Sequence, residues 1–173
     1  MPLVAGVLAL ALIGGGFMYV RSARLQPEPA PAADAAQSAP IPTGLKPHPQ
    51  ANLPPLQFPG YPMSRSPEVV TAAYRFAAEH PEVLSYVPCF CGCERSGHRG
   101  NEDCFVKARD INGDVVLWDD HGMECAVCLD VATRARLMHA AGASVREIRT
   151  AIDKEWGSKS TNHTHTPEPP TAN

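Results

Sequence analysis

The chain has 173 residues and a formal net charge of −3, and 6% of its residues are aromatic. No block of lysine and arginine is present, so the composition gives no support for binding to nucleic acid. We find no phosphate-binding loop, nucleophile elbow or paired carboxylates, so hydrolase chemistry has no support either. The unusual feature is a set of six cysteines, all of which lie between Cys89 and Cys128.

The first element in the chain is an apolar segment. Residues 3–20 carry no charge and, at about 1.5 Å per residue, are just long enough to span a bilayer core of roughly 30 Å. A cleaved signal peptide is the alternative, but its apolar region is usually shorter and no A-x-A cleavage site is present. We therefore expect residues 1–24 to be an uncleaved membrane anchor. Arg21 and Arg24 weakly favour a cytoplasmic location for the C-terminal part of the chain.

Two further segments lack the pattern of a folded domain. Residues 25–63 are rich in proline and predict a semi-extended spacer of the polyproline type. Residues 158–173 are polar and contain proline, so we expect a disordered tail in which His163 and His165 are ordinary tail residues. One small domain remains, residues 64–157. A core of that size is marginal without disulfides or bound metal.

The domain is expected to open with a helix. Ser66 is a suitable N-cap, Pro67 suits the first helical position, and the helix should end near His80, before Pro81. Further on, Asn112-Gly113 lies between CFVKAR and DVVLW, which is a strong signal for a β-hairpin.

Two more helices are expected after the hairpin. The first should start after Asp119 or Asp120, carry both Cys125 and Cys128, and end near Gly142. Ser144 and Glu147 form a capping box for the last helix. The predicted fold is therefore mainly α: a small cysteine-rich domain of about three helices with one β-hairpin.

Two groups of side chains suggest chemistry. The first is PCFCGC at residues 88–93 with a histidine and a cysteine after it, and the second is a histidine followed by C-x-x-C at the expected helix start. Thiolates are soft ligands for zinc, copper(I) and iron–sulfur clusters, and imidazole suits zinc and copper. The candidate metal ligands are Cys89, Cys91, Cys93, His98, Cys104, His121, Cys125 and Cys128. We expect the two groups to meet in one pocket.

Two alternatives to metal binding stay open. Cysteines one residue apart rarely bridge each other, because a disulfide requires Cα atoms roughly 5–6 Å apart. A fully oxidised form would therefore pair the cysteines of PCFCGC with Cys104, Cys125 and Cys128, and would leave both histidines unexplained. The other alternative is thiol–disulfide exchange by Cys125 and Cys128 at a helix start.

Other potential ligands are expected to have structural roles. His80 and His139 stand alone in the sequence, so we expect them to be packed or solvated rather than to bind metal. Met123 and Met138 offer thioethers to copper(I), but packing is the simpler interpretation.

The motif PCFCGC resembles the signature of the PCYCGC-motif protein family, with Phe90 in place of the tyrosine. The resemblance extends over Gly97-His98, Cys104-Phe105, WDDHGMECAVC and GASVREIRTAID. It implies a bacterial, exported or lipoprotein-anchored protein with an extracytoplasmic domain, metal handling at the eight candidate ligands, and no established enzyme activity. This chain has no lipobox cysteine, so an uncleaved helix would replace the lipid anchor.

The sequence and the family resemblance together predict a membrane-tethered protein that binds copper(I) or zinc ions. The resemblance implies an extracytoplasmic domain, against the weak signal of Arg21 and Arg24, and we expect that orientation. Copper(I) comes first because six thiols exceed what one zinc site needs. Sequestration, or delivery to a metal-donor or metal-acceptor protein, is favoured over catalysis because no acid–base pair is visible. Thiol–disulfide oxidoreductase activity and a disulfide-stapled interaction module are the alternatives.

Overall fold

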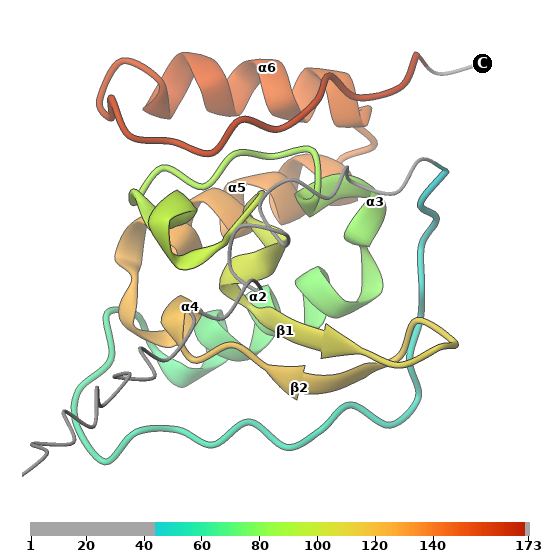
Figure 1. The fold of residues 1–173 in the computed structure, drawn as a ribbon, viewed down its shortest axis with the longest axis vertical. Helices are drawn as coiled ribbons and strands as arrows, with labels where there is room; N and C mark the ends of the chain where they lie inside the picture. The colour runs from blue at the N-terminus through green and yellow to red at the C-terminus, as the bar shows by residue number, and fades with distance from the viewer. Residues whose placement is uncertain (1–43, 172–173) are drawn as a thin grey trace, which may run out of the picture. The chain divides into compact units, whose positions relative to one another are not determined.

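The computed structural model describes residues 44–171 (Figure 1). Within this range the expected mainly α fold with one β-hairpin is confirmed, although two of the five α-helices are single turns of four residues. The elements in chain order are α2 (Pro67–Glu79), α3 (Pro81–Leu84), η1 (Cys93–Ser96), η2 (Glu102–Cys104), β1 (Val106–Arg109), β2 (Val115–Trp118), α4 (His121–Glu124), α5 (Ala126–Ala140) and α6 (Val145–Trp156).

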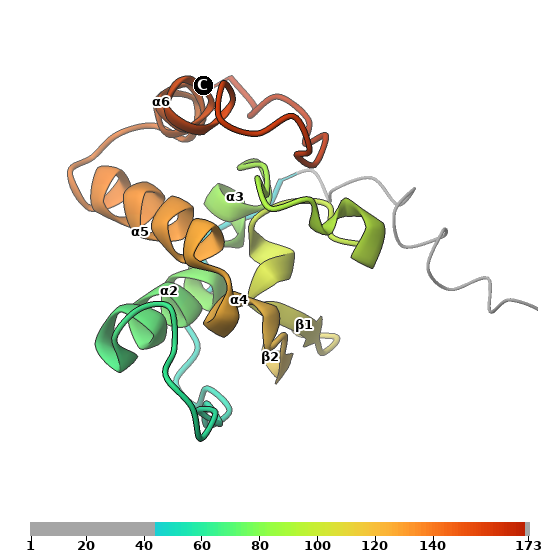
Figure 2. The same ribbon diagram turned by 90° about the vertical axis from the view of Figure 1, so that its left-hand side faces the viewer.

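Helix α5 lies at the centre of the helical part, in contact with α2 on one side and α6 on the other, while the hairpin lies beside α2 (Figure 2). Helix α2 starts at Pro67 and is followed by His80, as the sequence predicted. The Ser66 side chain makes no capping hydrogen bond. The helix start is therefore attributable to the backbone preference of Pro67 rather than to a side-chain cap.

The core between these elements is built around Tyr74. Its ring packs edge-to-face against Phe105 and Trp118, with centroid distances of 5.1 and 5.4 Å. Its hydroxyl donates to the carbonyl oxygen of Asp119 at 2.5 Å, so the one polar atom of this buried ring is satisfied. Tyr74 thus ties α2 to the end of β2, just before the segment that carries His121.

The hairpin forms where Asn112-Gly113 predicted it. Strands β1 and β2 pair antiparallel, and Gly113 adopts a φ of +94° that other residues rarely tolerate. The Asp110 carboxylate accepts hydrogen bonds from the backbone N–H groups of Asn112 and Asp114, both at 2.9 Å. The turn is therefore fixed by local chemistry.

The predicted second helix is not continuous, and this expectation was wrong. Cys125 has extended backbone angles, φ −97° and ψ 101°, and separates α4 from α5. Its sulfur accepts a hydrogen bond from the Cys128 N–H at 3.4 Å, so Cys125 acts as the N-cap of α5. An N-cap residue has non-helical backbone angles, so the helix is interrupted at Cys125 alone.

Helix α6 agrees closely with the prediction. The capping box between Ser144 and Glu147 is present in both directions. Ile148 and Ile152 are fully buried, one helical turn apart, and they form the face that packs against α5.

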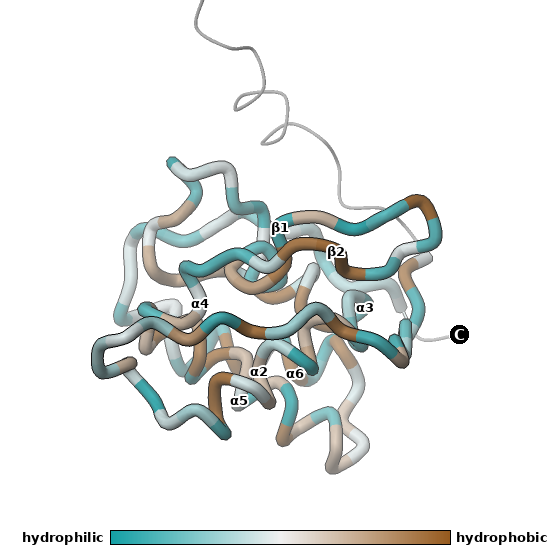
Figure 3. The backbone as a smooth tube through the Cα atoms, turned by 90° about the horizontal axis from the view of Figure 1, so that it is seen from below, coloured by the Kyte–Doolittle hydropathy of each residue, from teal (hydrophilic) through white to brown (hydrophobic). Residues whose placement is uncertain are grey.

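Extended chain without helix or strand flanks the domain at both ends of the described range. Residues 44–63, expected to be a spacer, run along the hairpin, where Gln50 exchanges hydrogen bonds with the backbone of Val115 and the Trp118 indole donates to the Pro54 carbonyl. Figure 3, which views the domain from this side, shows hydrophilic and hydrophobic positions mixed along the segment. The part of the predicted tail at residues 160–166 lies along the loop that holds Cys89 and Phe90.

The proposed membrane anchor, residues 1–24, lies outside the described residues, as does the spacer up to residue 43. Within residues 44–171, none of the helices has the length and apolar character needed to cross a bilayer.

Gly122 provides a test of how tightly α4 is held. A Cβ at this position would lie 2.6 Å from the Phe105 ring and 2.7 Å from the Cys104 carbonyl oxygen. We expect Gly122→Ala to lower the free energy of unfolding by about 1–3 kcal/mol, the range typical of overpacking, measured by urea denaturation of the full chain. Gly60→Ala is the control, because nothing lies within 4 Å of a Cβ there. Equal stability of the two variants would contradict this description of α4.

Candidate metal centre

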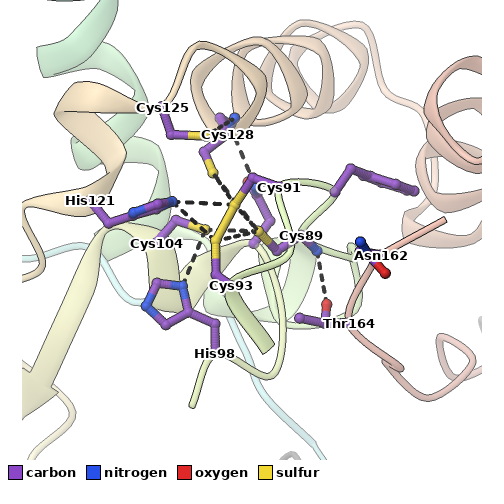
Figure 4. Close-up of a disulfide and its surroundings, with 12 residues drawn as sticks. Cys89, Cys91, Cys93, His98, Cys104, His121, Cys125, Cys128, Asn162 and Thr164 are labelled. Carbon is purple, nitrogen blue, oxygen red and sulfur yellow. Dashed lines mark hydrogen bonds between the residues drawn. A yellow bond between two sulfur atoms is a disulfide. The ribbon is translucent and has the colours of Figure 1, made fainter. Parts of the chain in front are cut away.

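The first part of the site is the loop that comes after α3. Pro88 leads into Cys89, Cys91 and Cys93, and the chain reverses at Gly92, whose φ of +82° is left-handed. The segment is therefore curled rather than extended, and Figure 4 shows the sulfur atoms of its three cysteines gathered together. This curl is a consequence of glycine at the central position.

The second part of the site comes from α4, α5 and η2. His121 is the first residue of α4, Cys125 caps α5 and Cys128 lies in its first turn, while Cys104 ends η2. These side chains approach the loop from the opposite side (Figure 4). The expected convergence of the two groups of ligands is therefore observed.

Cys89 occupies the middle of the cluster. Its sulfur lies 3.1 Å from that of Cys91, 3.3 Å from those of Cys93 and Cys104, and 3.8 Å from that of Cys128. The side chain is completely buried. A tetrahedral zinc ion with sulfur ligands at about 2.3 Å holds those sulfurs about 3.8 Å apart. The distance from Cys89 to Cys128 matches this spacing, whereas the other three distances are shorter, so those sulfurs would move apart slightly around a bound ion.

His121 adds a nitrogen donor beside two of these sulfurs. Its Nε2 atom lies 3.2 Å from the sulfur of Cys91 and 3.0 Å from that of Cys93. The backbone N–H of His121 donates to the Asp119 carboxylate at 3.0 Å, which holds the start of α4 in place.

His98 approaches the cluster from below in Figure 4. Its Nδ1 lies 3.5 Å from the Cys104 sulfur, and its Nε2 lies 4.0 Å from the Asp119 carboxylate. A carboxylate behind a histidine fixes the orientation of the ring in many metal sites. Sequence reasoning missed Asp119, which is 8% exposed. Its only signal was its position in the acidic pair before His121.

All eight residues predicted as ligands gather in this region, and seven of them form overlapping sets of four donors. The donor atoms within each set lie within 4.8 Å of one another. The sets are Cys89, Cys91, Cys93 and Cys128; Cys91, His121, Cys125 and Cys128; and Cys93, Cys104, His121 and Cys128. His98 belongs to none of these sets and stands behind Cys104.

The expectation that neighbouring cysteines of the motif would not bridge each other was wrong. Cys91 and Cys93 form a disulfide, with Cα atoms 5.7 Å apart. The turn at Gly92 brings the two residues into the range that a disulfide requires. The other four cysteines are free thiols, so the cross-pairing of PCFCGC with Cys104, Cys125 and Cys128 is not observed.

The free thiols differ in their tendency to ionise. Hydrogen bonds from Cys104 and Cys128 hold the pKa of Cys89 well below its usual value. Burial raises the pKa of Cys104, and hydrogen bonding with Cys104 and Cys125 raises the pKa of Cys128. Hydrogen bonds from the thiol and backbone N–H of Cys128, opposed by burial, lower the pKa of Cys125 to about 6. Negative charge is therefore favoured at Cys89 and Cys125.

The end of the described chain supports the loop. The Cys89 N–H donates to the Thr164 hydroxyl at 2.8 Å, and the Thr164 N–H donates to the Cys89 carbonyl at 3.0 Å. Thr164 is 1% exposed, and the Ser160 hydroxyl donates to the Phe90 carbonyl. Because these contacts satisfy backbone groups next to the cluster, residues 160–164 help to set the position of Cys89. Polar composition alone carried no sign of this role.

Comparison with known proteins identifies one relationship. The model of a family described as "Protein of unknown function with PCYCGC motif" matches residues 57–169. The expected resemblance is thereby confirmed. No curated protein and no solved structure gives a significant match.

The lowered pKa of Cys125 makes its reactivity testable. Above pH 6 the thiolate should predominate, so alkylation of Cys125 by iodoacetamide in the metal-free chain with the Cys91–Cys93 disulfide intact should reach half its maximal rate near a pH of about 6, against about 8.5 for an ordinary cysteine. Mass spectrometry of the modified peptide gives the rate. In Cys128→Ala, which removes the hydrogen-bonding thiol, the midpoint should move upward. A midpoint above pH 8 in the unchanged chain would contradict the assignment.

Proposed function

Because this chain belongs to the family of proteins of unknown function with the PCYCGC motif, which assigns no activity, we propose from the cysteine cluster itself that the protein binds soft metal ions. The observation that carries the proposal is the convergence of six cysteine sulfurs and His121 from three separate parts of the chain. A disulfide framework would require these sulfurs in pairs. A metal site requires them around common points, as in the overlapping sets of four donors.

The donor set favours copper(I) first and zinc second. Thiolates select soft ions over magnesium or calcium, which prefer oxygen ligands. Six sulfurs exceed the four donors of one tetrahedral zinc site, whereas a thiolate-bridged copper(I) cluster uses more. His121 suits either ion.

The disulfide between Cys91 and Cys93 makes this binding dependent on redox state. Opening it requires two electrons and two protons from an external dithiol, which becomes a disulfide in return. The reduced form then offers six thiols in place of the four that are free in this structure. Full metal binding therefore belongs to the reduced form.

Sequestration or delivery fits this site better than catalysis. Cys91 and Cys125 are partly exposed, while Cys89, Cys104 and Cys128 are buried, so an ion has a route in from a partner's ligands. The charge-free segment at residues 3–20 supports tethering to a membrane. We place the domain on the extracytoplasmic side, where a metal-donor or metal-acceptor protein would meet it.

Metal titration of the full chain tests this function. The protein, reduced and kept anaerobic in mild detergent, should take up copper(I) in competition with a chromophoric chelator, and should take up less before reduction. In Cys89→Ser the affinity should fall by at least the roughly tenfold typical of changes next to a metal, because four other sulfurs lie within 3.8 Å of the Cys89 sulfur. Competition spectra give the affinity.

Two further variants keep the test decisive. Cys125→Ser serves if Cys89→Ser does not fold, since Cys125 is only partly buried. His48→Gln serves as the control, because His48 pairs with Asp114 and belongs to none of the ligand sets of the cluster. If the reduced chain binds neither copper(I) nor zinc while all six thiols react with thiol reagents, the proposal fails.

Thiol–disulfide exchange is the second candidate, and the lowered pKa of Cys125 favours it. In this reaction the Cys125 thiolate would attack a substrate disulfide, forming a mixed disulfide and releasing one substrate thiolate. The Cys128 thiol would then lose its proton and close the Cys125–Cys128 disulfide, releasing the second thiolate. The substrate gains two electrons and the C-x-x-C pair loses them.

Insulin reduction distinguishes the two functions. An oxidoreductase should reduce insulin with dithiothreitol at a rate that Cys125→Ser abolishes and Cys91→Ser leaves within about twofold, since the nucleophile is Cys125. A metal-binding protein should lose metal affinity in both variants. Absence of insulin reduction by the unchanged chain would remove the second candidate.

A further inference from the structure

A second group of potential ligands lies at the junction of α2 and α3. His80 comes directly after α2, Glu82 lies in α3, and His139 lies in the last turn of α5. One ligand atom from each residue lies within 4.8 Å of the others. The His80 Nδ1 atom is 2.8 Å from the Glu82 carboxylate, and the two imidazole rings are 4.4 Å apart.

No sequence pattern connects these three residues. His139 is far along the chain from His80, and each histidine was expected to have a separate structural role. The two rings nevertheless lie side by side, because α5 packs along α2 and brings its last turn to the junction. Glu82 was not considered as a ligand at all.

One oxygen of the Glu82 carboxylate lacks a hydrogen-bond partner among the described residues. Its Oε1 atom is paired with His80, but its Oε2 atom is buried and has no hydrogen-bond partner. A buried polar atom without a partner is costly, more so when the group is charged, and such an atom needs an explanation. A cation bound between the carboxylate and the two imidazoles would supply it.

Phe76 makes the group rigid on one side. Its ring lies 4.9 Å from the His80 ring and 5.7 Å from the His139 ring, and Phe76 is 4% exposed. The two imidazoles are therefore held close to each other by an apolar wall. Nitrogen and oxygen ligands lie about 3.3–3.5 Å apart around a tetrahedral ion, so the His80 Nδ1 atom and the Glu82 carboxylate oxygen, now 2.8 Å apart, would separate slightly on binding an ion.

We propose that His80, Glu82 and His139 form a second metal site, which binds a borderline divalent ion of the zinc class through two imidazoles and one carboxylate. Three protein ligands leave the fourth position of a tetrahedral ion for water or for a ligand from another molecule. The donors are nitrogen and oxygen without sulfur, so this site does not share the preference of the cysteine cluster for soft ions.

The second site is separate from the cysteine cluster. Cys128 lies in the first turn of α5 and His139 in its last, which at about 1.5 Å per residue places them about 16 Å apart along the helix. An ion at one site therefore does not contact ligands of the other, and the two can be tested independently.

Zinc titration of the full, reduced chain tests this site by difference. Compared with the unchanged chain, His139→Gln and Glu82→Gln should each bind one equivalent of zinc fewer, or bind it at least tenfold more weakly. His48→Gln is the matched control, because His48 also pairs with a carboxylate, Asp114, at 2.7 Å but belongs to no group of three ligands among the described residues. It should retain every equivalent.

Two readouts separate this result from the behaviour of the cluster. With cobalt(II) as the probe, the sulfur-to-metal absorption bands should persist in His139→Gln, while the weaker bands of the additional ion should disappear. Failure of the cysteine cluster to bind metal would lower the total uptake but would leave the difference between the variants intact. If a variant does not fold, zinc-dependent shifts of the His80 and His139 ring protons in the unchanged chain decide. Absence of those shifts, or full zinc uptake by a folded His139→Gln, overturns the inference.

Discussion

The crowding of sulfur atoms around Cys89 is the constraint on which the rest of this structure depends. Four other sulfurs lie within 3.8 Å of its own, in a largely buried region. Neighbouring thiolates in such a region cannot all be charged, because their repulsion is barely screened and their hydration is lost. The charge must be removed by protons, by a disulfide or by a cation. In this structure a disulfide removes the charge of Cys91 and Cys93. Protons remove the charge of Cys104 and Cys128, whose pKa values are raised. A bound metal ion would be the third way to remove it.

The parts of the fold that depend on neighbouring residues were predictable from the sequence. The hairpin is a consequence of Asn112-Gly113, and α6 of the capping box at Ser144 and Glu147, because each signal acts within a few residues. The break at Cys125 was not predictable from periodicity, since a cysteine is not a typical N-cap and its role here depends on its sulfur accepting the Cys128 N–H.

The candidate site, too, was predictable from the sequence only in part. The eight cysteines and histidines could be identified from the sequence, because residue type and spacing alone indicate potential metal ligands. They did not identify Asp119, Thr164 or the group around His80, because their roles come from contacts between distant parts of the chain. Long-range contacts of this kind are set by how the helices pack, and single-sequence patterns carry little information about that.

The overlap among the ligand sets bears on what the cysteine cluster does with an ion. The set Cys91, His121, Cys125 and Cys128 is mostly half-buried, whereas the set Cys93, Cys104, His121 and Cys128 is mostly buried. Both share Cys128 and His121. If the reduced cluster binds metal as we propose, an ion would pass from the outer set to the inner one by exchanging two ligands while two remain bound. Exchange of this kind avoids a free ion and suits transfer between proteins better than permanent structural binding. Permanent zinc sites, in contrast, use a single closed set of four ligands.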